Sequence, residues 1–210
     1  MKLYDMTGAP NPRRVRIFLA EKGIDIDKVE VDVMGGENLQ PEYMAINPRG
    51  IVPTLEFEDG SIIDESSAIC RYFEETSPEP ALYGTDAISK ALIEAWIRRI
   101  DLDCYYPGTE VLRNSNPAFE NRAVAGLDNT PQIPALVDRG RKRVSIFYAQ
   151  FNEYLNGREF IVGDQYSAAD IVALCTVDFL EQYAGISIAP EYSALVSWYE
   201  RCAQRPSSNA

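Results

Sequence analysis

The sequence predicts an α/β first domain with a mixed four-stranded sheet, followed by an all-α second domain. Two observations predict this division. Strand and helix patterns alternate along the first third of the chain, until the breaker-rich segment Ser77-Pro78-Glu79-Pro80 interrupts them. Beyond that segment the strand patterns fade, and helical stripes of apolar residues take their place. We therefore place one domain at residues 1–78 and a second domain at residues 87–210.

The first domain contains four strand patterns and two clear helix patterns. Their order predicts a mixed sheet, because a helical crossover joins parallel strands and a tight turn joins antiparallel ones. Asp59-Gly60 is a strong hairpin turn, and Gly23 ends the first helix. In the second strand, Val29, Val31 and Val33 alternate onto one face. The predicted strands span residues 2–6, 27–33, 51–58 and 61–63, and the predicted helices span residues 13–22 and 65–75.

The second domain contains four helix patterns. Ile88, Leu92 and Ile100 lie on the apolar stripe of the first, and the third is apolar nearly all round, as a central buried helix would be. Just before the third helix, the Ser167 hydroxyl and the Asp170 carboxylate predict a capping box. The predicted helices span residues 87–106, 141–155, 170–183 and 191–204.

The composition excludes several kinds of chemistry. The chain has 210 residues, 20 basic against 32 acidic, a net charge of −12 and no histidine. Without histidine there is no Ser-His-Asp triad, no Cys-His pair and no His-ligated metal, and we expect no metal site. The negative charge repels phosphate backbones and anionic lipid, so we expect neither nucleic acid nor a membrane as partner.

The cysteines and the N-terminal segment bear on location. Cys70, Cys104, Cys175 and Cys202 are widely spaced and form no C-x-x-C motif, so we expect reduced and mostly buried thiols. The N-terminus enters a strand pattern at once, which leaves no room for a signal peptide. No apolar run reaches the ~18 residues of a membrane span. We therefore expect a cytoplasmic protein.

The segment from Asn47 to Leu55 has two interpretations. Pro53 lies where a strand should begin, a place that proline tolerates only at an edge or a bend. The segment is then either a simple loop-to-strand junction or a ligand site. In the second case a cis proline would turn the Val52 N–H and C=O outward to pair with an extended, peptide-like ligand.

The segment from Asp64 to Ile69 also has two interpretations. It begins a helix, whose free N–H groups and positive dipole end favour carboxylates. There Ser66 can donate to a carboxylate while Glu65 accepts from an ammonium group, which together match the α-amino-acid end of a ligand. The alternative is ordinary helix capping by Asp64 or Ser66.

Four local patterns occur together in this chain: Asn47-Pro-Arg-Gly-Ile-Val-Pro-Thr-Leu55, Asp64-Glu-Ser-Ser-Ala-Ile69, Gly163 and Ser167-Ala-Ala-Asp-Ile171. In this order and spacing they resemble the cytosolic glutathione transferase family, with a yeast-and-bacterial type most similar near both ends of the chain. The resemblance implies a thioredoxin-like N-terminal domain, an all-α C-terminal domain, a homodimer and glutathione as co-substrate in detoxification. It also implies that Pro53 is cis, that Val52 pairs with the cysteinyl backbone of glutathione, and that Glu65 and Ser66 hold its γ-glutamyl end.

The sequence departs from the family at the residue that activates the glutathione thiol. Relatives use a Tyr, Ser or Cys at the end of the first strand, and the serine position falls on Ala9 here. A thiol of pKa ~8.5 needs a shift of about 2 units, or roughly 2.7 kcal/mol, to ionise near neutral pH. A helix N-terminus supplies about 0.3–1 kcal/mol, up to ~2, and one hydrogen bond to a charged acceptor adds about 1.5–3.

The candidate donors to this thiol are few. They are the Asn11 amide, the Thr7 hydroxyl and the backbone N–H groups near Ala9 and Asn11, with Arg113 able to add positive charge. Alternatively, Thr7 and Asn11 only shape the turn.

The remaining parts of the site are predicted from the resemblance. Many relatives bind the glycine carboxylate of glutathione with a basic residue after the second strand, where this chain has Asn38 and Gln40. Arg13 and Arg49 are nearby alternatives, unless they are simply solvated surface residues. The electrophile pocket should lie between the domains, and the predicted wall residues are Ala9, Tyr105, Tyr106 and Val111.

Three functions follow as hypotheses. The first is a transferase that conjugates glutathione to a small apolar electrophile. The second is a non-catalytic binding module that kept the fold, since Ala9 lacks the activating hydroxyl. The third is another glutathione-dependent enzyme, such as a peroxidase, dehalogenase or isomerase, because a fold by itself does not fix its chemistry.

Overall fold

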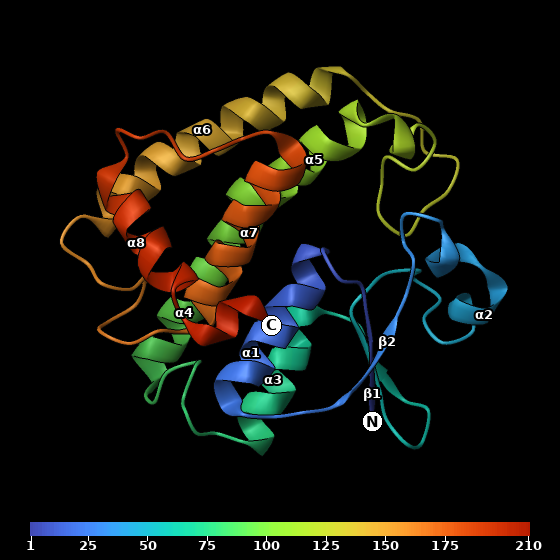
Figure 1. The fold of residues 1–210 in the computed structure, drawn as a ribbon, viewed down its shortest axis with the longest axis horizontal. Coiled ribbons are helices and arrows are strands. Elements are labelled where there is room, and N and C mark those ends of the chain that lie inside the picture. The colour runs from blue at the N-terminus through green and yellow to red at the C-terminus, as the bar shows by residue number, and fades with distance from the viewer.

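The computed structural model describes residues 1–210 and shows an α/β domain beside a helical domain (Figure 1). The sheet has the strand order β2-β1-β3-β4. Strand β1 pairs parallel with β2 and antiparallel with β3, and β3 pairs antiparallel with β4, which confirms the mixed four-stranded sheet. The strands are β1 (Lys2–Asp5), β2 (Asp27–Glu30), β3 (Thr54–Glu56) and β4 (Ile62–Ile63).

Helices cover the sheet and connect it to the second domain. α1 packs against α3 within the N-terminal domain and against α7 of the helical domain, while α2 lies away from them beyond β2 (Figure 1). Val15, Phe18 and Leu19 are buried on the packed faces of α1. The helical segments of this domain are α1 (Pro10–Lys22), η1 (Glu37–Leu39), α2 (Pro41–Met44) and α3 (Ser66–Thr76).

The second half of the chain is helical, as the sequence predicts. α7 lies at its centre, and most of its side chains are buried. None of the helices is both long and apolar enough to cross a bilayer. The helices are α4 (Ala87–Ile100), η2 (Asp101–Tyr105), α5 (Tyr106–Ser115), η3 (Pro117–Phe119), α6 (Ala135–Leu155), α7 (Ala168–Ala184), α8 (Ser193–Ala203) and η4 (Pro206–Asn209).

The helix predicted for residues 87–106 runs on to Ser115 through a π-helical turn. The turn is η2, and it ends with the N–H of Tyr106 donating to the carbonyl of Asp101, five residues back. Pro107 follows directly and has no N–H to continue the α-helical ladder, so the wider turn accommodates it. This turn sets the direction in which Tyr105 leaves the helix.

For α4 and β2, the residues predicted to face the core are partly wrong. Ile88 and Leu92 are 73% and 48% exposed, because α4 turns Ile93 and Ile97 toward the core instead. Val29 is 38% exposed while Val31 is buried, since β2 is a short edge strand that ends at Glu30.

The helix predicted for residues 141–155 begins earlier, at Ala135. Gly140 lies inside this helix, at the point where α6 crosses α5. A Cβ at this position would lie 2.5 Å from the carbonyl oxygen of Pro107. A glycine that weakens a helix locally is required here by close packing.

The capping box before α7 is confirmed. Asp170 accepts hydrogen bonds from the backbone N–H of Ser167 at 3.0 Å and from its hydroxyl at 2.8 Å. The same carboxylate accepts from the Ile161 N–H and the Trp198 indole N–H. One buried side chain therefore joins the loop before α7 to α8.

Candidate functional site

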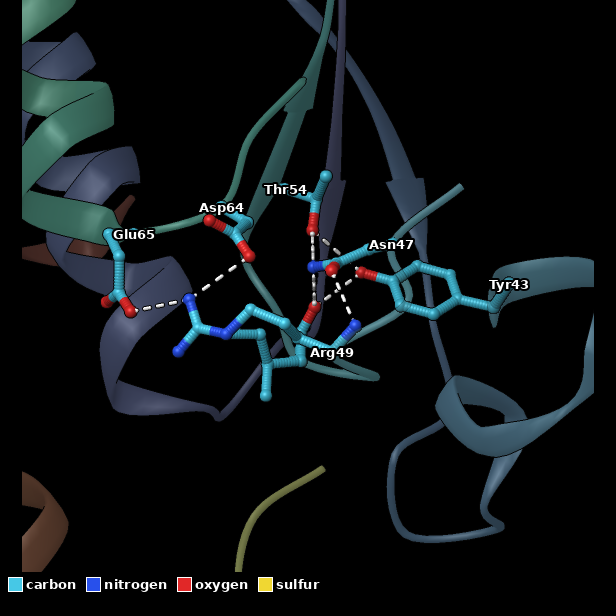
Figure 2. A network of polar contacts seen from close by, with 7 residues as sticks. Tyr43, Asn47, Arg49, Thr54, Asp64 and Glu65 are labelled. Carbon is cyan, nitrogen blue, oxygen red and sulfur yellow. Dashed lines mark hydrogen bonds and ion pairs between the residues drawn. The ribbon is translucent and has the colours of Figure 1, made fainter. Parts of the chain in front are cut away.

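The loop from Asn47 to Pro53 is held rigid by a buried polar network (Figure 2). Asn47 donates from Nδ2 to the Thr54 hydroxyl at 2.8 Å, and the Tyr43 hydroxyl donates to the Ile51 carbonyl at 2.6 Å. The Val52–Pro53 peptide bond is cis, as the family resemblance implied. Neither the N–H nor the C=O of Val52 hydrogen-bonds within the chain, so both are free to pair with a ligand.

The start of α3 lies beside this loop. Glu65 occupies the N-cap position with extended backbone angles, but its side chain does not cap the helix. Instead its carboxylate accepts from Arg49 at 2.8 Å, and the same guanidinium nitrogen lies 3.1 Å from Asp64 (Figure 2). Ser66 is buried at the first helical position. Arg49 thus connects the 47–53 loop to the carboxylates before α3.

Together these segments present a backbone edge, a carboxylate and a helix N-terminus within one surface. The free amide groups of Val52 match an extended peptide. The carboxylate of Glu65 matches an ammonium group, and the N–H groups that begin α3 match a carboxylate. The arrangement is therefore suited to a small peptide with a free α-amino-acid end.

The N-terminus of α1 offers one free backbone donor. Ala9 is the N-cap, and Pro10 and Pro12 have no N–H. The Ala9 N–H donates to the Met6 carbonyl, whereas the Asn11 N–H has no acceptor within the chain. Of the backbone donors that the sequence suggested, the one at Asn11 is free.

The side chains of Asn11 and Thr7 both have partners. Asn11 donates from Nδ2 to the Tyr105 hydroxyl at 3.1 Å, across the domain junction. The Thr7 hydroxyl is exposed and donates to the Glu30 carboxylate at 3.0 Å, which ties the turn to β2. This position favours a turn-shaping role for Thr7.

Tyr105 is the side chain that the sequence did not connect to Asn11. Burial raises the pKa of its phenol to about 12, so the hydroxyl stays protonated near neutral pH. Because the hydroxyl accepts from Asn11, its own proton is available to a further acceptor. The Arg14 guanidinium lies 4.6 Å from the ring centroid and pairs with Asp101 at 2.9 Å, which fixes the ring.

Arg113 lies in the last turn of α5 and is half-buried. Its Nη1 donates to the Arg122 carbonyl at 2.8 Å, and its guanidinium packs on the Phe119 ring. Burial lowers the pKa of Arg113, the phenol of Tyr105 raises it, and the neighbouring charge of Arg122 lowers it further. Arg113 is therefore a partly desolvated cation near Tyr105.

The two residues expected near the glycine carboxylate differ in position. Asn38 is buried, and its Nδ2 donates to the Gly50 carbonyl at 2.7 Å, so this amide supports the 47–53 loop. Gln40 is exposed, and its Nε2 lies 3.5 Å from the Gly36 carbonyl. Of the two, Gln40 is accessible to a ligand.

The expected pocket wall is only partly present. Val111 is fully buried, and it packs against Gly140 of α6, so placing it in the pocket wall is wrong. Tyr106 is 50% exposed, and Ala9 is half-buried at the start of α1. A cavity of about 330 Å³ lies on the α7 side of this helix start, and its lining includes Gly8, Pro10, Arg13, Asp178, Glu181 and Tyr183.

Sequence reasoning missed Tyr105 as a partner of Asn11, Arg49 as the support of Glu65, and Arg14 as the link to Asp101. Each contact joins residues that no local pattern connects. The charged side chain of Arg14, on the same helix as Val15 and Phe18, was the available signal, because a buried arginine requires a carboxylate partner.

Comparisons with known proteins agree with this fold. Residues 3–81 match the family model for the glutathione S-transferase N-terminal domain, and residues 116–206 match the model for its C-terminal domain. The chain is 31% identical to glutathione S-transferase 2 of Saccharomyces cerevisiae over 212 residues, covering 99% of this chain and 87% of that protein. It is also 43% identical to a maleylacetoacetate isomerase of Pseudomonas aeruginosa over 93 residues, covering 43% of this chain and 44% of that protein.

Two solved structures are similar over their whole length. A glutathione S-transferase domain-containing protein of Marinobacter aquaeolei superimposes with a TM-score of 0.90 at 33% identity, covering 99% of both chains. Gtt2 of Saccharomyces cerevisiae superimposes with a TM-score of 0.90 at 30% identity, covering 100% of this chain and 99% of that one.

Proposed function

The chain belongs to the glutathione S-transferase family, and on that premise we propose that it conjugates the thiolate of glutathione to a small electrophile. The relatives are named as transferases, which supports an enzyme rather than a non-catalytic binding module. The observation that carries the proposal is the free backbone of Val52 beside Glu65 and Ser66. These groups match the peptide bond and the γ-glutamyl end of glutathione.

In the proposed complex, glutathione lies extended along the 47–53 loop. The backbone of Val52 pairs with the cysteinyl residue, as one added strand pairs with another. Glu65 accepts from the γ-glutamyl ammonium group, and the N–H groups at Ser66 donate to its carboxylate. Arg49 holds the Glu65 carboxylate in place. Gln40 is the exposed amide proposed for the glycine end.

The cysteinyl sulfur would then lie near the start of α1. We propose that the Asn11 N–H and the helix dipole stabilise its thiolate, together with the proton of the Tyr105 hydroxyl. A helix end supplies about 0.3–1 kcal/mol and a charge-assisted hydrogen bond about 1.5–3, against the roughly 2.7 required. In this arrangement Asn11 positions Tyr105, which stands in for the hydroxyl that Ala9 lacks.

The chemical step needs no further protein base. The thiol proton passes to water as the thiolate forms, and the thiolate then attacks the electrophilic carbon to form a carbon–sulfur bond. On a haloarene the halide leaves with its bonding electrons, and on an epoxide a carbon–oxygen bond breaks and the oxygen takes a proton from water. The domains contribute orientation of the two reactants and stabilisation of the thiolate.

Titration of glutathione followed by thiolate absorbance in the ultraviolet tests the proposal. We expect saturable binding at millimolar or lower ligand and a thiol pKa below that of free glutathione. A panel of haloarene and epoxide electrophiles then measures turnover. Absence of glutathione binding at millimolar concentration would contradict the proposal, and binding with an unshifted thiol pKa would contradict the activation step.

A glutathione-dependent isomerase is the second candidate. It is favoured by the match of 43% identity over 93 residues to a maleylacetoacetate isomerase. An isomerase regenerates glutathione at the end of each cycle, whereas a transferase consumes it. The ratio of glutathione consumed to product formed therefore separates the two activities.

We also propose that the protein forms a homodimer and works in the cytoplasm. Ile88 and Leu92 of α4 form an exposed apolar face that a second copy would bury. The I88E/L92E variant should then sediment as a monomer, while I146E, changed at an exposed position on α6, should not. For the location, all four cysteines are free thiols, as is usual in a reducing compartment.

A further inference from the structure

Two arginines share one aromatic ring at the domain junction. The guanidinium carbons of Arg113 and Arg122 lie 4.6 Å and 5.8 Å from the centroid of Phe119, which is itself buried. Neither arginine forms an ion pair, although acidic residues outnumber basic ones by 32 to 20 in this chain. Two half-buried cations are thus close together without an anion.

Other arginines at the junction differ in this respect. Arg13 pairs with Asp178, and Arg14 pairs with Asp101 at 2.9 Å. Bringing a cation out of water costs free energy unless an anion compensates it. The pKa of Arg113 is lowered first by its burial and further by the charge of Arg122, which shows the direction of that cost. An anion in contact with the Arg113 guanidinium would offset this cost.

Arg122 belongs to a segment that connects the domains, and Arg113 lies in the last turn of the helix before it. Residues 116–134 leave α5 and descend to the N-terminal domain beside β2 and α2 (Figure 1). Arg122 donates to the carbonyls of Val33 at 3.3 Å and Met34 at 3.0 Å. At the tip, Gly126 has φ +73°, and a Cβ there would lie 2.2 Å from the Arg49 carbonyl oxygen. The segment therefore borders the proposed glutathione site.

Charge is distributed unevenly around the start of α1. The cavity on the α7 side is lined by Asp178 and Glu181, with Arg13 already paired to Asp178. On the α5 side, Arg113 lies about two turns of helix beyond Tyr105. The one carboxylate of α5, Glu110, pairs with Arg139 instead. A negatively charged group entering the site is repelled from the first side and attracted to the second.

We infer that Arg113, with the charge of Arg122 beside it, forms a subsite for a carboxylate on the electrophilic substrate. The inference rests on the proposed function, and it narrows the substrate class from small electrophiles in general to those that carry an anionic group. Arginine suits this role because its planar fork of N–H donors matches the two oxygens of a carboxylate. The thiolate then attacks a carbon held between the α1 start and this anchor.

Two ligand carboxylates could reach the arginines, one on the electrophile and one on the glycine residue of glutathione. The Nη groups of Arg122 already donate to the carbonyls of Val33, Met34 and Ala118. Arg113 donates only through Nη1, and it follows Tyr105 by about two turns of helix. Because we place the thiolate at Tyr105, we assign the carboxylate to the electrophile.

Calorimetric binding of two product analogues tests the assignment without requiring turnover. S-(para-carboxybenzyl)glutathione and its neutral match, S-(para-carbamoylbenzyl)glutathione, differ only in the anionic group. We expect the wild type to bind the carboxylate about tenfold more tightly, a typical gain for a charge-assisted contact. R113Q should abolish this preference and leave the affinity for the carbamoyl compound unchanged, and R113K should keep part of the preference.

The control variant is R139Q, which removes an exposed arginine paired with Glu110 one helix away. It should keep the full preference. Equal binding of the two compounds by the wild type would overturn the inference without any variant. Equal weakening of both compounds in R113Q would overturn it as well, because that result indicates a structural role.

Binding of glutathione and of its glycine ethyl ester shows which carboxylate Arg113 contacts. If R113Q weakens glutathione but not its glycine ethyl ester, the arginine binds the glycine carboxylate, and the assignment to the electrophile is overturned. If the wild type binds glutathione but does not prefer the carboxybenzyl conjugate over the carbamoylbenzyl one, only the proposed subsite is contradicted. If neither glutathione nor the conjugates bind to the wild type, the proposed function fails together with it.

Discussion

The side-chain amide of Asn11 donates to the hydroxyl of Tyr105 across 3.1 Å, and this bond connects the first turn of α1 to the π-helical turn η2. The two residues are 94 positions apart in the chain and come from different domains. Tyr105 also stacks under Arg14, whose carboxylate partner Asp101 begins the same turn. The orientation of the phenol therefore depends on the docking of the two domains.

Replacing Asn11 by Ala should raise the pKa of the bound glutathione thiol. The change removes the donor that orients Tyr105, a hydrogen bond worth about 0.5–1.5 kcal/mol, which corresponds to about 0.4–1.1 pKa units. Tyr105→Phe should raise the pKa further, because it removes the proposed donor itself. Ultraviolet titration of the thiolate measures both variants.

Thr7→Val provides the control for these variants. The Thr7 hydroxyl donates to Glu30, so its loss should leave the thiol pKa unchanged. If Asn11→Ala and Tyr105→Phe both leave the thiol pKa unchanged, the proposed role of Tyr105 is contradicted. The thiolate would then be stabilised only by the backbone N–H of Asn11 and the helix dipole.

Replacing Arg49 by Ala should weaken glutathione binding by about 1.4- to fivefold. Arg49 lies 2.8 Å from Glu65, and without it the exposed Glu65 carboxylate loses the support that holds it toward the γ-glutamyl ammonium group. An exposed ion pair contributes roughly 0.2–1 kcal/mol, so the effect should be modest. Calorimetry measures the affinity.

Lys28→Ala is the matched control for Arg49→Ala, because it also removes a surface cation of the N-terminal domain from an exposed pair, with Asp25. An equal loss of affinity in this variant would show that Arg49 acts only through the general charge of the domain.

Features formed by neighbouring residues could be predicted from the sequence. The family resemblance implied the cis bond before Pro53, and the pattern at Ser167 and Asp170 predicted the capping box. In each case the chemistry depends on neighbours three or fewer positions apart. Such local patterns are largely independent of how the domains pack.

Features that depend on packing between distant elements could not be predicted in this way. Ile88 and Val111 are both apolar residues of helices in the structure, yet one is 73% exposed and the other fully buried. Which face of a helix is covered depends on the neighbours that the chain brings to it. The contact from Asn11 to Tyr105 depends in addition on the π-helical turn, which redirects the side chains that follow α4.

Arg14→Ala should lower the free energy of unfolding by about 3–5 kcal/mol, since it leaves a buried carboxylate uncompensated. Arg14 pairs with Asp101 at 2.9 Å and donates to the Thr176 hydroxyl at 3.1 Å, so it connects α1 to two elements of the helical domain. Urea unfolding followed by circular dichroism measures the loss.

Arg139→Ala is the comparison, because Arg139 lies 3.1 Å from Glu110 with 60% of its side chain exposed. Here the expected loss is under about 1 kcal/mol. Similar losses in the two variants would contradict a special role for Arg14 in domain docking.

Asp170→Ala should lower the free energy of unfolding more than Asp86→Ala, although both side chains belong to a capping box at the start of a helix. Asp86 is exposed, and its loss should cost about 1 kcal/mol. Asp170 is fully buried, and its loss leaves the Ile161, Ser167 and Trp198 donors without an acceptor. The free energy of unfolding should therefore fall by about 3 kcal/mol or more. Urea midpoints of the two variants measure the difference.

The titration of Asp170 gives a further, signed expectation. Burial raises the pKa of this carboxyl above its ordinary value, although its hydrogen bonds lower it in part. Between the ordinary value of about 3.9 and the raised one, the folded protein binds more protons here than the unfolded chain. This group's contribution to stability is therefore complete at lower pH and is lost as the pH rises through that interval. Asp170→Asn has no such titration, so the free energy of unfolding of the wild type minus that of the variant should decrease with rising pH. An increase over the same interval would mean that the four hydrogen bonds to Asp170 outweigh its desolvation.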